Sequence, residues 1–373
     1  MITMNSVLLH GRATWDRAYF PADEFEERLT LVQVAMRDQG LRGLLVGGNF
    51  LDYANLCYLT QYIPWAGWSM AVVPVEGEIT LVTGVGGGRE LPVARPRTWV
   101  ADVRNLQNLD HAFRQLLAER GIAGRVGTAS LDVLGPRLRQ RVLENLQGIE
   151  YVAADSLLGA QRLTLRSREL SALKVAAGVV DAAADALRRA YQDNTPNGLA
   201  LTEAEYEARR LGALDFRGLI NQAETGELAP VEEQTPFKSG QVVAYLAVNC
   251  MGYWADLGVT LADAPAANVY SARAAVRGMA AAARTGVRTG ELAAVAADDL
   301  GPADFEQAQA WGLGSGIGLA LHSQPQIVTD GQDELALDMA LTLRVRLPEK
   351  GGPGLLVSDL VRVTDTGGVS LFS

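Results

Sequence analysis

Side chains suited to acid–base, nucleophilic or metal chemistry are scarce in this sequence. It contains three histidines, of which His322 is one, and two cysteines, Cys57 and Cys250. Because an imidazole titrates near neutral pH, His322 is a candidate general acid or base. The cysteines lie far apart and outside any C-x-x-C motif, so we expect neither a disulfide framework nor a thiolate metal site. Three histidines are also too few for a histidine-rich metal cluster.

A glycine-rich segment, Gly312–Gly318, precedes His322 and contains Ser315. Its glycines lack the G-x-G-x-x-G spacing of dinucleotide-binding loops, and no clear strand and helix flank them. Gly314 and Gly316 on either side of the serine also depart from the G-x-S-x-G pattern of a nucleophile elbow. We therefore expect neither a nucleotide-binding loop nor a nucleophilic serine in this segment.

Composition and charge limit the class of protein. The chain has 373 residues, of which 48% are hydrophobic and 20% charged, and its formal net charge is −10. This composition is typical of a globular protein, and the length favours two domains. The negative charge argues against nucleic acid or an anionic membrane surface as the main partner. Residues 1–28 carry five acidic residues and no apolar core of signal-peptide length, and no apolar segment reaches the length of a membrane helix, so we expect a cytoplasmic protein.

Alternating helix and strand signals predict an α/β domain over residues 1–160. A hairpin-like pair of strands is expected where Glu76 and Gly77 separate two apolar runs. The expected helices cover residues 25–37, 112–120 and 134–146, and the expected strands cover 44–46, 71–75, 79–82, 125–127 and 151–152.

Residues 161–373 are expected to form an α+β domain, mostly antiparallel sheet covered by helices. A long helix begins at Ser167, and Thr202 followed by Glu205 resembles a capping box that starts a second helix. The almost wholly apolar run 241–248 is typical of a strand covered on both faces. Later segments complete the domain: a strand at 256–261, helices at 271–284 and 290–300, and paired strands in the C-terminal tail.

Several motifs occur in the order and spacing of a known enzyme family. They are Asp256 after the segment 252–255, the segment 314–319 with His322 and Pro325, and Ser358-Asp359 before the segment 361–364. With these motifs, residues 25–370 resemble the creatinase, prolidase and aminopeptidase P family. The resemblance implies a creatinase-like α/β N-terminal domain, a pita-bread fold for residues 161–373 and a homodimer.

Metal-using members of that family bind two divalent ions through two Asp, one His and two Glu. Of the two aspartates only Asp256 remains here, because Tyr245 or Leu246 stands at the other position, depending on the direction of counting. The positions of the histidine and the glutamates are taken by residues that are not acidic: Ser315, Arg344 and Ser358. One carboxylate beside a permanent guanidinium cannot balance two divalent ions. We therefore expect no metal cofactor and no metallopeptidase activity.

Creatinase is the family's precedent for hydrolysis without a metal, through a histidine that precedes the first aspartate strand. Val231 occupies the matching position here, and no histidine lies between His111 and His322. The resemblance therefore does not imply creatinase's own mechanism. It does place His322, the family's second histidine, in the cleft, where that histidine contacts substrate.

The remaining candidates each have two open interpretations. Arg344 either binds a substrate carboxylate, with Asp256 orienting it or acting as a base, or fills the former metal site by pairing with Asp256. Glu232 is an acid or base, or else part of a solvated loop. Trp65 covers a ligand, or else packs between domains. Three further residues are expected to line the same cavity and bind substrate: Tyr245, Ser315 and Ser358.

Two functions follow from these interpretations. The first is a metal-independent enzyme that acts on a small polar, carboxylate-bearing molecule by C–N hydrolysis or a related elimination or rearrangement. His322 would transfer the proton, Arg344 would hold the carboxylate, and Asp256 and Tyr245 would set the orientation. The second is a catalytically inactive pita-bread protein that binds a peptide, a metabolite or a protein. An open space shared by His322, Arg344 and Asp256 favours the enzyme, whereas closure of the site by Arg344 favours the binding protein.

Overall fold

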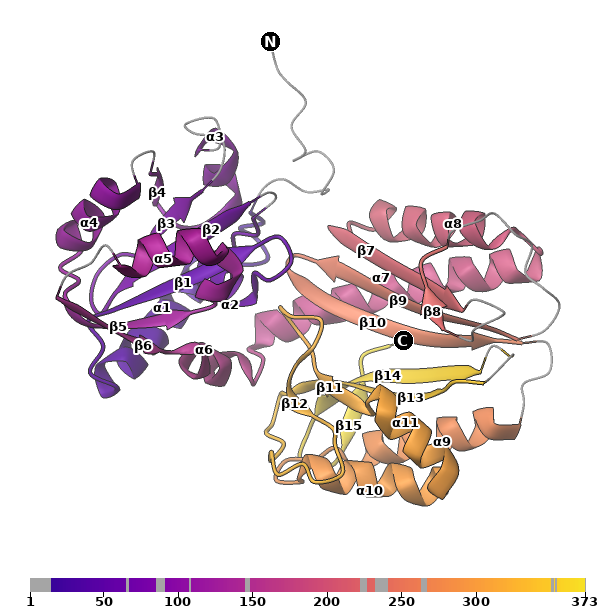
Figure 1. Cartoon of the computed structure of the whole chain (residues 1–373). Coiled ribbons are helices and arrows are strands. Elements are labelled where there is room, and N and C mark those ends of the chain that lie inside the picture. Colours follow the sequence, from indigo (N-terminus) through magenta and orange to yellow (C-terminus); the bar gives the residue numbers. More distant parts are fainter. Residues whose placement is uncertain are drawn as a thin grey trace, which may run out of the picture. The chain divides into compact units, whose positions relative to one another are not determined.

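The structure is a computed structural model that describes residues 15–64, 67–84, 91–106, 109–144, 148–221, 227–231, 241–262, 267–349, 352 and 354–372. The chain divides into two compact units, Met1–Arg162 and Leu163–Ser373 (Figure 1). The expected domain boundary, between residues 160 and 161, lies two residues before this division and within helix α6 (Asp155–Arg162).

A six-stranded mixed sheet, in the order β4-β3-β2-β1-β5-β6, forms the centre of unit 1. The predicted hairpin around Glu76 and Gly77 is present, because β2 and β3 pair antiparallel. The strands are β1 (Gly43–Asn49), β2 (Trp68–Pro74), β3 (Thr80–Thr83), β4 (Asp102–Asn105), β5 (Gly124–Ala129) and β6 (Ile149–Ala153). The helices before α6 are α1 (Ala22–Asp38), α2 (Ala54–Thr60), α3 (Leu91–Ala94), α4 (Leu109–Glu119) and α5 (Pro136–Glu144). Unit 1 is therefore the α/β domain that the sequence predicts.

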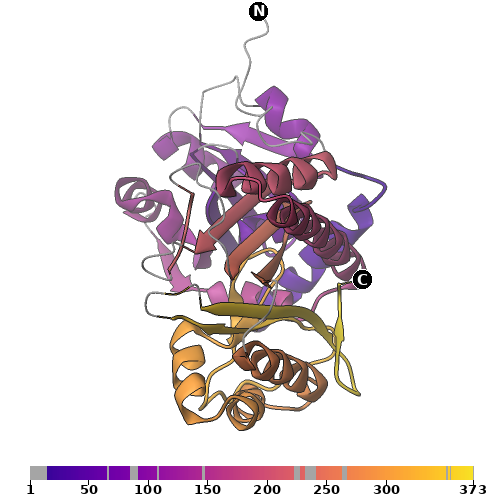
Figure 2. The same ribbon diagram turned by 90° about the vertical axis from the view of Figure 1, so that its right-hand side faces the viewer.

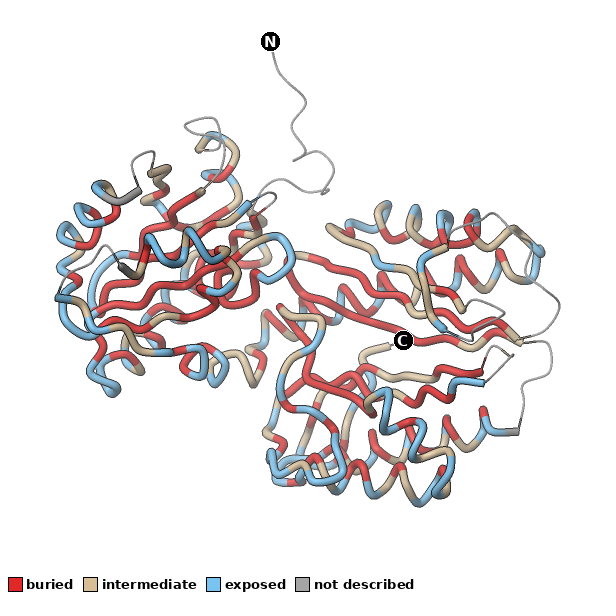
Figure 3. The backbone as a smooth tube through the Cα atoms, in the orientation of Figure 1, coloured by how far each residue is buried: buried red, intermediate tan, exposed pale blue. Residues whose placement is uncertain are grey.

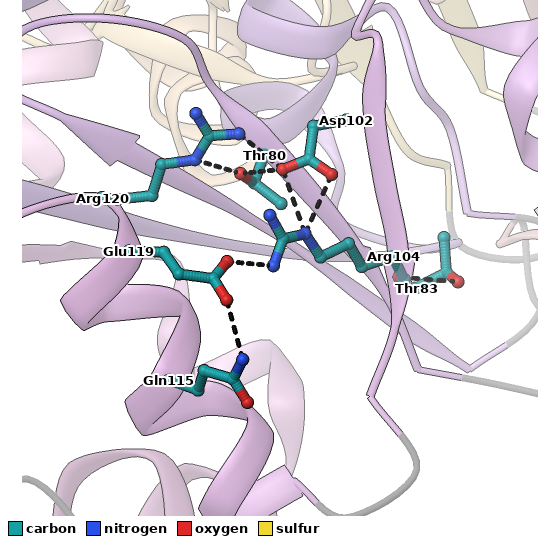
Figure 4. Close-up of polar contacts among 7 residues, drawn as sticks. All are labelled: Thr80, Thr83, Asp102, Arg104, Gln115, Glu119 and Arg120. Carbon is teal, nitrogen blue, oxygen red and sulfur yellow. Dashed lines mark hydrogen bonds and ion pairs between the residues drawn. The ribbon is translucent and has the colours of Figure 1, made fainter.

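Two arginines link helix α4 to strands β3 and β4 of the sheet of unit 1 (Figure 4). Arg120 follows α4 and donates hydrogen bonds to Thr80 Oγ1 (2.9 Å) and Asp102 Oδ2 (2.5 Å). Arg104 on β4 donates to Asp102 Oδ1 (2.9 Å) and to Glu119 Oε2 (2.6 Å). Arg104 joins β4 to α4, and Arg120, which follows α4, binds β3 and β4, so this network has a structural role.

Unit 2 contains two antiparallel sheets between layers of helices (Figures 1 and 2). The strand orders are β10-β9-β7-β8 and β12-β11-β13-β14-β15. Helices α7 and α8 cover the first sheet, and α9 and α11 pack on the second. The sheets meet at β10 and β14, where Thr260 Oγ1 donates to the Leu356 carbonyl and accepts from the Leu356 amide, both at 2.9 Å. This arrangement is the α+β architecture that the sequence predicts.

The helices of unit 2 are α7 (Ser167–Gln192), α8 (Asn197–Arg210), α9 (Ala267–Ala282), α10 (Thr289–Leu300) and α11 (Pro302–Trp311). The strands are β7 (Asp215–Asn221), β8 (Leu228–Ala229), β9 (Val242–Cys250), β10 (Tyr253–Leu261), β11 (Gly314–Gly316), β12 (Ser323–Gln326), β13 (Ala340–Leu347), β14 (Leu355–Val363) and β15 (Gly368–Ser370). No helix among the described residues combines the length and apolar character that a bilayer span requires.

Strand β9 lies in the interior of unit 2 (Figure 3). All of its residues are buried except Tyr245, which is half-buried. This confirms the prediction of a strand covered on both faces.

The predicted capping box at Thr202 is wrong. Helix α8 begins earlier, at Asn197 after Pro196, and Thr202 lies inside the helix. There its hydroxyl donates to the carbonyl oxygen of Gly198 (2.8 Å). A threonine can bond the carbonyl four residues back within a helix, so the same residue pattern does not require a helix start. The sequence analysis also predicts neither β7 nor α11.

Candidate functional site

Asp256 and Tyr245 lie on one face of the β9–β10 hairpin. Asp256 pairs with Ala247 and Tyr245 pairs with Gly258, and directly paired and alternate residues share a face. The hydroxyl of Tyr245 donates to Asp256 Oδ2 at 3.0 Å. Leu246 points to the opposite face and belongs to the hydrophobic core. Of the two positions that counting left open, Tyr245 is therefore the one beside Asp256.

Arg344 on β13 contacts both Asp256 and His322. Its Nη1 lies 3.8 Å from Asp256 Oδ2, a distance that makes an ion pair but not a hydrogen bond. Its Nη2 lies 3.4 Å from His322 Nδ1. Asp256 Oδ1 and Arg344 Nε are buried and have no hydrogen-bond partner among the described residues. Arg344 therefore lies close to the Asp256 carboxylate but forms no hydrogen bond with it.

The contact with Arg344 determines which nitrogen of His322 carries a hydrogen. A guanidinium can only donate, so Nδ1 accepts, and the neutral ring then has its hydrogen on Nε2. Partial desolvation and then the positive charge of Arg344 lower the pKa of His322 below its ordinary value, against the opposite effect of Asp256. His322 is therefore neutral at pH 7, and as an exposed residue it is accessible to a ligand.

The phenol of Tyr245 also has a shifted pKa. Burial and then the negative charge of Asp256 hold the pKa of Tyr245 well above 10. The phenol consequently keeps its hydrogen and donates it to the aspartate across the physiological pH range.

Three hydroxyl groups lie beside Arg344 on the five-stranded sheet. Ser358 pairs with Arg344, and Ser315 pairs with Thr342, which alternates with Arg344 along β13. Ser358 Oγ accepts a hydrogen bond from the Gly258 amide (2.7 Å) and so links this sheet to β10. Ser315 Oγ and Thr342 Oγ1 are buried without a hydrogen-bond partner in the described parts of the chain. Thr342 is not among the residues that the sequence predicts.

Arg217 on β7 is a second residue that sequence reasoning missed. It pairs with Ala247, which in turn pairs with Asp256, so the three residues form a row on one face. The Arg217 guanidinium stacks on Trp254, 4.4 Å from the ring centre, and lies 3.5 Å from Asp215 Oδ2. The only signal in the sequence is a short alternation of polar and apolar residues at 215–217.

The structure brings together six of the predicted site residues: His322, Asp256, Arg344, Tyr245, Ser315 and Ser358. The other two, Glu232 and Trp65, lie outside the described residues. Val231, at the position of creatinase's histidine, packs against the hydrophobic core of unit 2.

The donor atoms of this cluster suit hydrogen bonding and proton transfer. Of its six residues only Asp256 carries a carboxylate, and the Arg344 guanidinium lies next to it. No group of three or more His, Cys, Asp or Glu side chains within the described residues is arranged to hold a metal ion.

Comparisons with known proteins agree with this architecture. Residues 28–164 match the creatinase/prolidase N-terminal domain, and residues 171–365 match metallopeptidase family M24. The probable dipeptidase PepE of Mycobacterium tuberculosis is 26% identical over 381 residues, which cover 94% of this chain and 95% of PepE. The putative dipeptidase YkvY of Bacillus subtilis is 24% identical over 302 residues, or 76% of this chain and 82% of YkvY.

The structure is similar to the crystal structure of the prolidase from Pyrococcus horikoshii OT3. The TM-score is 0.79 at 18% sequence identity, and the match covers 93% of this chain and 98% of the prolidase. This similarity confirms the predicted pita-bread fold. The match to metallopeptidase family M24, residues 171–365, covers more than half of this chain, so the chain belongs to that family.

Proposed function

We propose that this protein is a metal-independent hydrolase that cleaves a C–N bond in a small polar molecule bearing a carboxylate. The dipeptidase and prolidase names of its relatives support hydrolysis of such a bond. The observation that carries the proposal is the position of Arg344, which contacts the carboxylate of Asp256 and the imidazole of His322.

The pair of divalent ions used by other members of the family does not fit these residues. Two such ions carry four positive charges and need several carboxylates. Here the Arg344 guanidinium lies 3.8 Å from Asp256 Oδ2 and would repel a cation bound to that oxygen. The Tyr245 phenol stays protonated, and Ser358 already accepts a hydrogen bond from Gly258. We therefore derive no catalytic step through a metal.

The substrate carboxylate binds Arg344 in this proposal, because a guanidinium donates two parallel hydrogen bonds to a carboxylate. That binding draws Nη2 away from His322 Nδ1, which now has a free lone pair. It also offsets the positive charge that lowers the pKa of His322. The substrate thereby makes the imidazole a better base at the moment when a base is required.

His322 then transfers a single proton. It accepts the proton from a water molecule as the oxygen of that water adds to the carbon of the C–N bond. The C–N bond breaks, and the nitrogen leaves with the proton that His322 returns to it. The carbon retains the hydroxyl group, so the products are the acid and the amine, and the imidazole is neutral again.

Asp256 acts through Arg344 and is a positioning residue in this proposal. It is 1% exposed, and its Oδ2 holds both Tyr245 and Arg344. A base that is shielded from solvent cannot take a proton from water unless Arg344 moves. We therefore assign the proton transfer to His322, which is exposed.

The geometry gives less support to the inactive binding protein. In that alternative Arg344 closes the site by pairing with Asp256. The pair instead lacks a hydrogen bond, and the Asp256 Oδ1 and Arg344 Nε atoms have no partner among the described residues. A cytoplasmic location and a homodimer remain predictions from the sequence.

The test is hydrolysis of N-acyl amino acids and N-carbamoyl amino acids by protein purified without a chelator. We expect turnover that a chelator does not reduce and that falls by about 10²-fold or more in His322→Gln. His111→Gln, which changes an exposed histidine of unit 1, is the matched control. Stoichiometric manganese, zinc or cobalt in the active protein, or hydrolysis that needs added manganese, would overturn the proposal. So would unchanged turnover in His322→Gln.

A further inference from the structure

We propose that Arg217 is a second guanidinium for the substrate carboxylate and that the site therefore selects molecules with a free carboxylate. Arg217 lies on the four-stranded sheet, whereas Arg344 lies on the five-stranded sheet. The inference rests on the proposed function for the presence of a substrate carboxylate. Its test measures binding and does not depend on turnover.

The strand register directs Arg217 toward the strand of Asp256. Adjacent strands are about 4.8 Å apart, so the backbone of Arg217 lies about 10 Å from that of Asp256, with Ala247 between them. The methyl group of Ala247 leaves space for a long side chain to cross. The Arg217 guanidinium crosses it, because it stacks on Trp254, two residues before Asp256 on the same face of β10.

The stacked arrangement leaves the guanidinium suited to bind an anion. Trp254 is buried, and the guanidinium carbon of Arg217 lies over its ring, 4.4 Å from the ring centre. A guanidinium that covers an aromatic ring can still donate hydrogen bonds from the N–H groups on its edge. The side chain of Arg217 is 42% exposed, and its ion pair with Asp215 is 3.5 Å long. A ligand carboxylate can therefore reach these N–H groups and form two hydrogen bonds with them.

The charge of Arg217 acts at the same site as that of Arg344. Burial is the largest influence on both groups: it lowers the pKa of His322 and raises that of Tyr245. Both guanidiniums lower the pKa of His322 and that of Tyr245. A carboxylate bound between the two cations would oppose this effect on the imidazole. Its arrival should therefore raise the pKa of His322.

A structural alternative is that Arg217 only covers Trp254. The substitution Arg217→Met separates the two roles, because methionine keeps an apolar chain over the indole and removes the charge and the donors. Arg188→Gln is the matched control, since Arg188 on α7 is 40% exposed and pairs with an aspartate, Asp185.

The probes are 4-oxopentanoate, in which a methylene group replaces the nitrogen of an N-acyl amino acid so that the C–N bond to be cleaved is missing, and its uncharged amide. Binding and the pKa of His322 are measured together by NMR titration of the imidazole signals, which the His322→Gln variant assigns. We expect the acid to bind at least about 10-fold more tightly than the amide and to raise the pKa of His322. In Arg217→Met the acid should lose about 10-fold in affinity and the amide should lose none, while Arg188→Gln should behave as the wild type.

Three results would overturn the inference: no preference of the wild type for the acid, an equal loss for acid and amide in Arg217→Met, or no loss in that variant. The proposed function fails separately. If turnover requires manganese while the preference for the acid still depends on Arg217, the metal-free mechanism is wrong and the carboxylate site remains.

Discussion

Removal of the Arg344 guanidinium should leave the buried carboxylate of Asp256 without its neighbouring cation. The aspartate side chain is 2% exposed and would keep only the hydrogen bond from Tyr245. Arg344→Met is the suitable change, because methionine replaces the apolar stem and carries no charge. A buried carboxylate that loses its cation has no access to water in exchange, so the folded state should be destabilised.

The size of this effect follows from the distance between the charges. At 3.8 Å, two unit charges interact by about 4 kcal/mol at an effective dielectric constant of 20 and by about 1 kcal/mol in water. Arg344 is 18% exposed, and its Nη1 makes no hydrogen bond to the carboxylate. We therefore expect a coupling free energy of about 2 kcal/mol between Arg344 and Asp256.

A double-mutant cycle with Arg344→Met and Asp256→Asn measures this coupling. Amide hydrogen exchange of β10 and β13 is the assay, because it reports the local opening free energy in a chain with two compact units. The same cycle on Arg188 and Asp185, an exposed helical pair, should give about 0.5 kcal/mol or less. A coupling between Arg344 and Asp256 as small as that of the exposed pair would refute the arrangement from which the function is argued.

The sequence predicts the fold well because its signals are local. Apolar periodicity marks β9 and the hairpin of β2 and β3, and motif spacing marks the segment before His322. The error at Thr202 is also local, since one residue pattern serves both a helix start and a helix interior. The order of the strands within the sheets depends on contacts between distant residues, and motif spacing supplied it only through the resemblance to a known family.

The site is harder to predict because its chemistry depends on register. Counting along the chain could not decide between Tyr245 and Leu246, and a shift of one residue moves a side chain to the opposite face of a sheet. The place of Arg217 in the site could not be predicted from the sequence for the same reason. Arg217 and Asp256 lie in one row because both pair with Ala247, which is on a third strand. Strand β7 itself has only a weak sequence signal.

Three further measurements test separate parts of the site. Ser358→Ala removes the acceptor of the Gly258 amide and should destabilise unit 2 by about 1–2 kcal/mol in the same exchange assay; an unchanged opening free energy would contradict the link between the sheets. Because the folded state holds the Tyr245 proton to higher pH than the unfolded chain does, stability should fall as the pH rises above 10, and Tyr245→Phe should remove that part of the fall in urea unfolding. Because the pKa of His322 in the free protein is lowered from its ordinary value of 6.5, kcat/KM, which reports the free enzyme, should decline at acid pH with a midpoint below 6.5, whereas a decline centred above 6.5 would contradict the lowered pKa.

The charge at position 344 should decide whether a divalent cation can enter the site. Arg344→Glu replaces a repelling guanidinium with a second carboxylate close to Asp256, and two carboxylates with neighbouring hydroxyls form an oxygen donor set for manganese. Arg344→Gln is the control, because it removes the repulsion without adding an anionic ligand. We expect isothermal titration calorimetry to detect manganese binding to Arg344→Glu and none to the wild type or Arg344→Gln over the same concentrations. Equal binding by Arg344→Gln would mean that repulsion alone excludes the ion, and binding by the wild type would mean that the guanidinium does not exclude it.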